Sequence, residues 1–395
     1  MRRTAESIQW GLFCASSWTW CIGMYLPFVM LRLWGWPGFW AFFVPNVLGC
    51  AAFGFVLDAR RSREVAARLG WACALFGAVT IAYQCWFAGW IAQGLGTVDA
   101  AGAGADSPVG APGAMRTVLA TAAPLALLAG ALFLALRGDA FWCTAGTAVT
   151  LLSGLVVLLP GGTERATDAA ATLAAHGAAT LPPGPLLEPL SLAFAFPTIA
   201  AGFLLSPYLD LTFHRAAQQA PSPRIAFATF GLAFGAMLLL VASFFDPETG
   251  GPRVGPALLV LWGVQLLFTV AVHLRELLVA SPAVRIPAAA TGALVAAAVV
   301  LATPAFLFTT DARLRPGEPM YLAWLGAYGL LFPVIVLLER RAVPRRISIA
   351  VLALGLPCYL LGAWDFMTWL MPVPIAAAAW ASRHQWAPPA CSTSE

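Results

Sequence analysis

Apolar stretches recur from end to end of this 395-residue chain, and they constrain its fold more than any other feature. Many are about 20 residues long, the length that a helix needs to cross roughly 30 Å of hydrocarbon. They are apolar on every side, without the alternation that membrane β-strands show. With 60% hydrophobic residues, 10% charged residues and a mean hydropathy of +0.81, no soluble domain remains to be placed. The sequence therefore predicts an all-α, polytopic transmembrane helix bundle.

Twelve spans result when the apolar stretches are divided at Pro, Gly and Arg residues. They cover residues 8–33, 36–57, 69–93, 117–136, 140–160, 188–212, 224–245, 256–279, 286–308, 319–338, 347–363 and 365–381. The Ala-, Gly- and Pro-rich segments 94–115 and 161–187 are predicted to be flexible outside loops.

The basic residues indicate how the chain is oriented, and all 22 of them are Arg. With the N-terminus inside, sixteen lie in cytoplasmic segments and six outside, as the positive-inside rule requires. The six are Arg32, Arg116, Arg165, Arg253, Arg313 and Arg315. We therefore expect a multi-pass protein of a bacterial-type cell inner membrane with both termini cytoplasmic. Its partner is the lipid bilayer, no nucleic acid is expected, and the sequence does not encode the oligomeric state.

The order of spans is compatible with an inverted repeat. The second long loop follows five spans, so the next five begin on the opposite side of the membrane. The predicted units are residues 1–160, the loop 161–187, the second repeat 188–339, and two C-terminal helices with a cytoplasmic tail, 340–395. A weak internal echo relates Ile22–Pro27 in span one to Ala201–Pro207 in span six.

Spans one and six also carry small and polar residues in the middle of the membrane. Span one has Ser16, Ser17, Thr19 and Gly23, and span six has Pro197 and Thr198. These residues predict interrupted helices, and interruptions at matching positions of two repeats indicate a central binding site.

Other polar and aromatic residues within the spans have two interpretations. Gln84, with Trp86 nearby, and Gln265 are suited to bind a polar or zwitterionic ligand, or to form hydrogen bonds between helices. Trp18 either closes over a ligand or packs in the core.

Asp210 and His214 lie four residues apart, hence on one helical face near the inner end of span six. They are candidates for a proton relay or an inner gate, or else form a solvated helix end that is paired locally. His273, Arg275 and Glu276, at the inner end of span eight, would pair with them across the cytoplasmic mouth or form a local anchor.

Enzyme chemistry has no sequence signal here. The four His residues fall in separate segments, the eight Cys residues form no CxxC pair, and no nucleotide-binding or nucleophile motif has its proper context. We expect no enzyme, no metal site and no cofactor beyond a coupling ion. A membrane-embedded transferase would need an acid or His cluster that the sequence lacks.

Three motifs carry a family resemblance: Ala15-Ser-Ser-Trp-Thr-Trp20, Trp36-Pro-Gly-Phe-Trp40 and Val44-Pro-Asn-Val-Leu-Gly49. Together they resemble the first two helices of sodium:solute symporter-like proteins of the amino acid, polyamine and organocation superfamily, with looser agreement over Ser206–Arg215. The resemblance implies a five-plus-five inverted repeat followed by two extra helices. It places the solute among spans one, three, six and eight.

The resemblance also implies a sodium site, formed by backbone carbonyls of the first helix and hydroxyls of the eighth. Ala15 and Thr19 would supply the first part, but span eight offers only Thr269 where the family pattern has a Ser/Thr pair. The coupling ion therefore stays open between Na⁺ and H⁺.

The leading hypothesis is a secondary-transporter-like protein that binds or moves a small polar solute near the bilayer midplane. The predicted binding residues are Ser16, Ser17, Trp18, Thr19, Gln84, Trp86, Pro197, Thr198 and Gln265, with Asp210 and His214 as the gate. The rival is a non-transporting membrane sensor or scaffold of the same fold, whose partner docks on the Arg340–Arg346 cluster or on the tail from Arg383 to Glu395.

Overall fold

The computed structural model describes residues 2–102, 111–156, 186–279, 288–301, 313–339 and 343–383. Within these ranges the regular structure is helical, apart from one short antiparallel hairpin. Eight helical segments are long and apolar enough to cross a membrane. The prediction of an all-α bundle of apolar helices is thus confirmed.

In the first part of the chain, α1 and α2 form a broken first helix, and α3 to α7 follow it. The helices are α1 (Arg2–Trp18), α2 (Cys21–Val44), α3 (Phe53–Val56), α4 (Ala59–Arg68), α5 (Gly70–Gly102), α6 (Ala111–Ala135) and α7 (Asp139–Leu155). A π-helical segment, Pro45–Gly49, joins α2 to the turn before α3.

The second part begins with another interrupted helix. It contains α9 (Pro189–Leu205), a 3₁₀ segment (Ser206–Leu209), α10 (Leu211–Gln219), α11 (Pro223–Ala242), β1 (Phe245–Asp246), β2 (Gly251–Pro252), α12 (Pro256–Val279) and α13 (Ala288–Leu301). It continues with α14 (Glu318–Gly326), a π-helical segment (Ala327–Leu331), α15 (Phe332–Glu339), α16 (Arg345–Trp364), a 3₁₀ segment (Thr368–Leu370) and α17 (Pro372–Ala381).

Helix α2 is kinked at Gly35, whose φ of 63° lies in the left-handed region. Glycine adopts this conformation readily because it has no Cβ. Gly35 lies between the first two predicted spans, 8–33 and 36–57. Pro37 follows at a helix start, where a missing backbone N–H is tolerated.

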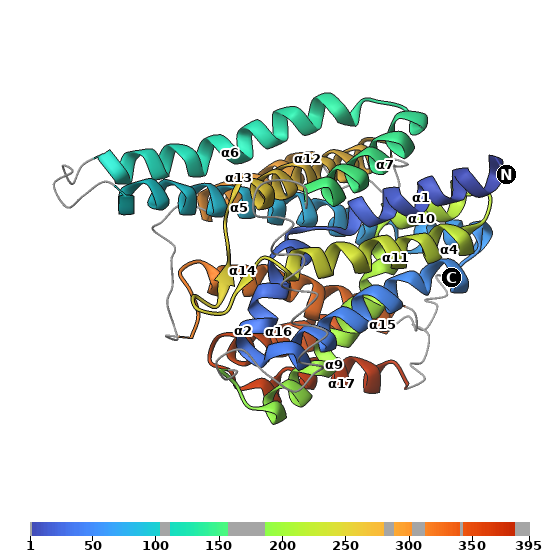
Figure 1. The fold of residues 1–395 in the computed structure, drawn as a ribbon. Coiled ribbons are helices and arrows are strands. Elements are labelled where there is room, and N and C mark those ends of the chain that lie inside the picture. Colours follow the sequence, from blue (N-terminus) through green and yellow to red (C-terminus); the bar gives the residue numbers. More distant parts are fainter. Residues whose placement is uncertain are drawn as a thin grey trace.

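The helices form two packed groups (Figure 1). Helices α5, α6, α12 and α13 pack against one another along one side of the molecule. Helix α1 packs on α11 and α7, while α2 packs on α11 and α9. Helix α5 is central, since 94% of its most apolar window is buried, whereas the corresponding windows of α6 and α16 are only 22% buried. The exposed apolar faces of α6 and α16 are those that a bilayer would cover.

The structure corrects one predicted loop. Helix α5 continues to Gly102 and α6 begins at Ala111, so much of segment 94–115 is helical. The segment is rich in Ala, the strongest helix former, and this outweighs its small-residue composition. Residues 161–185 of the other predicted loop, Arg340 and Arg341 of the basic cluster, and the tail from residue 384 lie outside the described residues.

Candidate functional site

The first helix is interrupted in the core of the bundle. Helix α1 ends at Trp18 and α2 begins at Cys21, with Trp20 in an extended conformation between them. The backbone N–H of Cys21 donates to Gln84 Oε1 of α5 (3.2 Å), and the Tyr321 hydroxyl of α14 donates to the Cys21 carbonyl (3.1 Å). Side chains of neighbouring helices thus replace the helical hydrogen bonds that the break removes, as an apolar environment requires.

A second interruption lies at residues 206–210, and not at Pro197 as predicted. Helix α9 continues through Pro197, because a bundle tolerates the loss of one backbone hydrogen bond. The chain then forms a 3₁₀ turn that contains Pro207, and the backbone at Asp210 is extended. The Asp210 carboxylate accepts the Thr212 backbone N–H (2.7 Å) and so caps the N-terminus of α10.

Direct contacts join the two interruptions. The hydroxyls of Ser17 and Thr212 are 3.0 Å apart and hydrogen-bonded. The rings of Trp18 and Phe213 have centroids 4.7 Å apart. The end of α1 and the start of α10 therefore form one buried junction.

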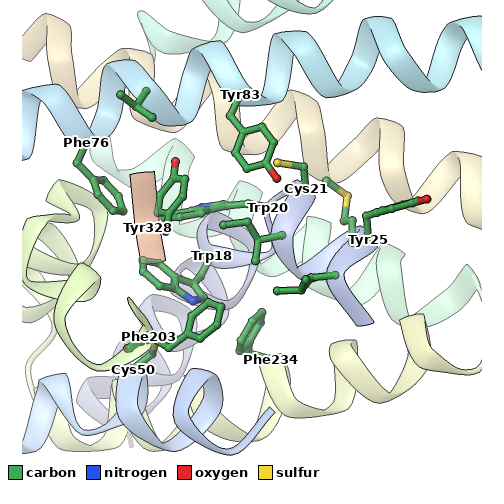
Figure 2. Close-up of a cluster of buried hydrophobic side chains, with 14 of the residues drawn as sticks. Trp18, Trp20, Cys21, Tyr25, Cys50, Phe76, Tyr83, Phe203, Phe234 and Tyr328 are labelled. Carbon is green, nitrogen blue, oxygen red and sulfur yellow. Dashed lines mark hydrogen bonds between the residues drawn. The ribbon is translucent and has the colours of Figure 1, made fainter. Parts of the chain in front are cut away.

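A small cavity lies beside this junction. Its lining includes Trp18, Trp20, Asn46, Ser206 and Tyr328, and the Trp18 indole donates to Asn46 Oδ1 (2.9 Å). Figure 2 shows the aromatic side chains of this lining, Trp18, Trp20 and Tyr328, within the buried core. Its volume is about 10 Å³. A single water molecule needs about that much space, so this conformation has no room for a larger solute.

Of the nine predicted binding residues, only Trp18 lines this cavity. Ser16, Ser17, Thr19 and Gln84 lie at or next to the first interruption, where they bond to the backbone or to neighbouring side chains. Four others lie elsewhere: Trp86, Pro197, Thr198 and Gln265.

Two of these four take part in contacts between distant segments of the chain. Gln265 of α12 donates to the Ser153 hydroxyl of α7 (2.8 Å), and Thr198 donates to the Met371 carbonyl (2.7 Å). Trp86 stacks on Trp90 at 5.1 Å. Gln265 therefore forms a hydrogen bond between helices, which was the second of its two interpretations.

The hydroxyls among the predicted ion ligands are already bonded to backbone carbonyls of α1. Thr19 Oγ1 donates to the Ala15 carbonyl (2.7 Å), and Thr269 Oγ1 of α12 donates to the Ser16 carbonyl (3.4 Å). No carboxylate takes part in these bonds. Among the described residues no cluster of three or more His, Cys, Asp or Glu residues is suited to a metal ion.

A buried ion pair joins α2 to the start of α14. Arg32 contacts Glu318, whose side chain is 0% exposed. Glu318 also accepts the Tyr25 hydroxyl (2.8 Å) and the Arg315 backbone N–H (2.8 Å). The carboxylate is thus compensated by one cation and two neutral donors, which a buried charge requires.

A second ion-pair network joins α10, α12 and α7. Arg215 binds Glu276 through two hydrogen bonds of 2.6 and 2.8 Å. Arg275 contacts Asp139 at 2.6 Å and Glu276 at 3.2 Å. Two guanidinium groups and two carboxylates therefore tie three helices together.

The two networks lie at opposite ends of the bundle. The Trp262 indole of α12 donates to the Met24 carbonyl, next to Tyr25 of the Arg32–Glu318 network. Glu276 lies fourteen residues further along the same helix, or about 21 Å at 1.5 Å per residue. The helix interruptions lie between the two networks.

The structure does not show Asp210 and His214 as a pair. The His214 ring bonds to the Ser62 hydroxyl (2.9 Å) and to the Tyr208 carbonyl (3.0 Å). The residue of α10 that pairs with α12 is Arg215, which binds Glu276, and not Asp210 or His214. Asp210 instead caps α10, as the second interpretation expected of a helix end, although the side chain is buried and not solvated.

Several buried polar atoms near the interruptions have no hydrogen-bond partner among the described residues. They are Asp210 Oδ2, Gln84 Nε2, Gln265 Oε1 and His273 Nε2. An unpaired buried donor or acceptor costs roughly 1–3 kcal/mol, and an unpaired carboxylate costs more. The Asp210 and Gln265 oxygens can therefore accept a further hydrogen bond, and the Gln84 amide nitrogen can donate one.

The predicted binding residues did not include the polar cavity residues Asn46, Ser206 and Tyr328, and Glu318 was not predicted as the partner of Arg32. Asn46 and Ser206 each adjoin a proline within an apolar span, and Tyr328 is a rare phenol within another. These polar residues beside prolines were a usable signal. No protein-family model, curated protein or solved structure matches the chain, so the site rests on its geometry.

Proposed function

We propose that this protein is a secondary-transporter-like membrane protein that binds a small polar solute at the two helix interruptions. One observation carries the proposal: both interruptions meet in the core, between ion-pair networks at opposite ends of the bundle. Interrupted helices expose backbone groups and helix ends at membrane depth, which polar solutes and ions recognise. Each network would hold one end closed while the other opens.

The packing of the helices supports a rocking movement. Helices α5, α6, α12 and α13 form one group, while α1, α2, α9 and α11 form the other. In this proposal residues 1–160 and 188–339 are inverted repeats, within twelve spans. Both termini are cytoplasmic, in agreement with the Arg distribution. The Arg215–Glu276 network would then close the cytoplasmic end, and the Arg32–Glu318 pair the outer end.

Asp210 is the proposed coupling residue. Its side chain is 0% exposed, forms no ion pair among the described residues and has one oxygen without a partner. A buried anion without a counter-charge is costly, so a proton or a sodium ion that neutralises it would stabilise this conformation. The Thr19 and Thr269 hydroxyls donate hydrogen bonds to backbone carbonyls of the same junction. They are available to a sodium ion only if those bonds open.

The sensor or scaffold alternative is favoured by the small volume at the junction. A cavity of about 10 Å³ holds no solute in this conformation. A protein that had lost transport would keep such a closed, self-bonded junction. A transporter would have to open it by at least the volume of its solute.

The test is thermal unfolding of the purified protein with a panel of small polar and zwitterionic solutes. The sole cation is sodium, potassium or choline, and each condition is measured at two pH values. A ligand that binds only the native state raises the melting temperature by mass action. A solute-dependent rise that sodium enhances supports sodium coupling, and one that depends only on pH supports proton coupling. No shift under any condition would favour the sensor or scaffold.

Two matched variants locate the coupling group. Asp210→Asn removes the charge at the junction, whereas Asp58→Asn removes the charge of the corresponding cap on exposed helix α4. Both replacements retain a side-chain oxygen for the cap. We expect Asp210→Asn to abolish the cation or pH dependence of the solute shift and Asp58→Asn to retain it. Equal behaviour of the two variants would refute the role of Asp210.

A further inference from the structure

The short helix α4 carries four arginines on its exposed face. Arg60, Arg61, Arg63 and Arg68 are exposed, whereas Ser62 on the opposite face is buried. We propose that this face binds the phosphate groups of anionic phospholipids at the membrane surface. The proposal does not depend on whether the protein transports a solute.

The connections at both ends of α4 place it at the membrane surface. Residues 21–56 and 70–93 are each long and apolar enough to cross a membrane. Leu57 and Asp58 alone separate α4 from the first of these segments, and Leu69 alone separates it from the second. The helix has ten residues, which span about 15 Å at 1.5 Å per residue. With both ends this close to hydrocarbon, α4 lies along the surface, within reach of lipid head groups.

Aromatic side chains on both sides of α4 indicate its depth. Phe55, before the helix, is 55% exposed, and Trp71, after it, is 48% exposed. An exposed phenylalanine at the end of a span is suited to the hydrocarbon, and a tryptophan there is typical of the boundary with the head groups. The arginines between them therefore lie at the depth of the phosphates. This position favours a phospholipid over a soluble acidic partner.

Two of the four arginines have no partner in the part of the chain that the structure describes. Arg60 pairs with Glu64 at 2.6 Å, and Arg61 donates to the Val56 carbonyl at 3.5 Å. The other two, Arg63 and Arg68, lie on either side of the Arg60–Glu64 pair by the helical period. A guanidinium binds phosphate through two parallel N–H groups. Clusters of arginines on an amphipathic surface helix are typical of binding to anionic lipids.

The buried face of α4 is bonded to α10, so a bound lipid would also hold α10 in place. Ser62 Oγ and His214 Nδ1 are 2.9 Å apart and hydrogen-bonded, and Gln218 Nε2 donates to Ser62 Oγ (3.1 Å). Helices α4 and α10 pack side by side (Figure 1). Lipid that binds the native arrangement of these helices would stabilise it by mass action, and thermal unfolding would report the binding.

The experiment is a thermal-unfolding titration of delipidated protein in detergent. The probes are dioleoylphosphatidylglycerol, which is anionic, and dioleoylphosphatidylcholine, which is zwitterionic. Arg63→Gln combined with Arg68→Gln removes two charges from α4, and the matched control, Arg345→Gln combined with Arg346→Gln, removes two exposed arginines from α16. We expect the α4 variant to raise the half-saturating concentration of phosphatidylglycerol by at least about tenfold. The control variant should titrate like the wild type.

Two further measurements separate a lipid site from other sources of a shift. Raising the salt concentration from about 0.1 M to about 1 M shortens the Debye length from roughly 10 Å to roughly 3 Å, so the phosphatidylglycerol shift of the wild type should largely disappear. Inorganic phosphate should not reproduce that shift, because it lacks the acyl chains that hold a lipid at the surface of α4.

Several outcomes would overturn the proposal. Equal shifts with the two lipids, or a shift that high salt leaves intact, would exclude recognition of the anionic head group. A shift with inorganic phosphate would identify a site for free anions, and no response to phosphatidylglycerol would leave α4 to a soluble acidic partner. An α4 variant that titrates like the wild type, or equal weakening in both variants, would exclude α4 as the site.

Discussion

The Arg32–Glu318 pair gives the sharpest prediction about stability. Glu318→Gln keeps the size of the side chain and removes its charge. Arg32 is 9% exposed and Glu318 is 0% exposed, so the variant leaves a buried guanidinium without a counter-ion. Breaking a buried ion pair from one side typically costs about 3–5 kcal/mol. For a chain of 395 residues, an unfolding entropy of about 2 cal/mol/K per residue turns ~3 kcal/mol into a melting-temperature decrease of about 4 °C.

The assay is a double-mutant cycle followed by thermal unfolding in detergent. Arg32→Gln and Glu318→Gln are measured singly and together, and the double variant should recover most of the stability because no lone charge remains. The exposed pair Arg60–Glu64, with side chains 69% and 59% exposed, serves as control. Its Glu64→Gln variant should change the free energy of unfolding by less than about 1 kcal/mol. A coupling energy for the buried pair no larger than that of the control would refute the reasoning.

Two further predictions concern packing and pH. Gly146→Ala should destabilise the protein strongly, because its Cβ would lie 2.5 Å from the Phe13 backbone; Gly154→Ala in the same helix meets nothing within 4 Å and should stabilise by about 0.5–1 kcal/mol. Thermal unfolding of both variants checks this, and equal effects would contradict the close α1–α7 contact. The backbone N–H of Arg61 holds the pKa of the Asp58 carboxyl below its ordinary 3.8, so the contribution of this cap is fully present above that pH and is lost as pH falls through the folded-state pKa. Asp58→Ala should therefore melt below the wild type at neutral pH and approach it under acid conditions; a constant difference would exclude the ionised cap.

The sequence alone determined the class of the fold. Apolar runs of membrane length leave helices as the only way to satisfy every backbone group, and the structure has eight such helical segments among its described residues. The polar residues of Ala15–Trp20 also located the first interruption, because Ser, Thr and Trp in mid-span need partners that a regular apolar helix does not require. Local composition was sufficient for both conclusions.

The tertiary structure decided which polar groups meet. The sequence suggested that the ends of spans six and eight meet, but it did not identify Arg215 as the partner of Glu276 or Gln84 as the acceptor of the Cys21 amide, since each pair joins helices that are distant in the chain. The tertiary structure also placed the second interruption after α9 and not at Pro197. Asp210 forms a helix cap there, where α10 begins. Hydrophobic length is a local property of the chain, whereas the partner of a buried charge depends on how whole helices pack.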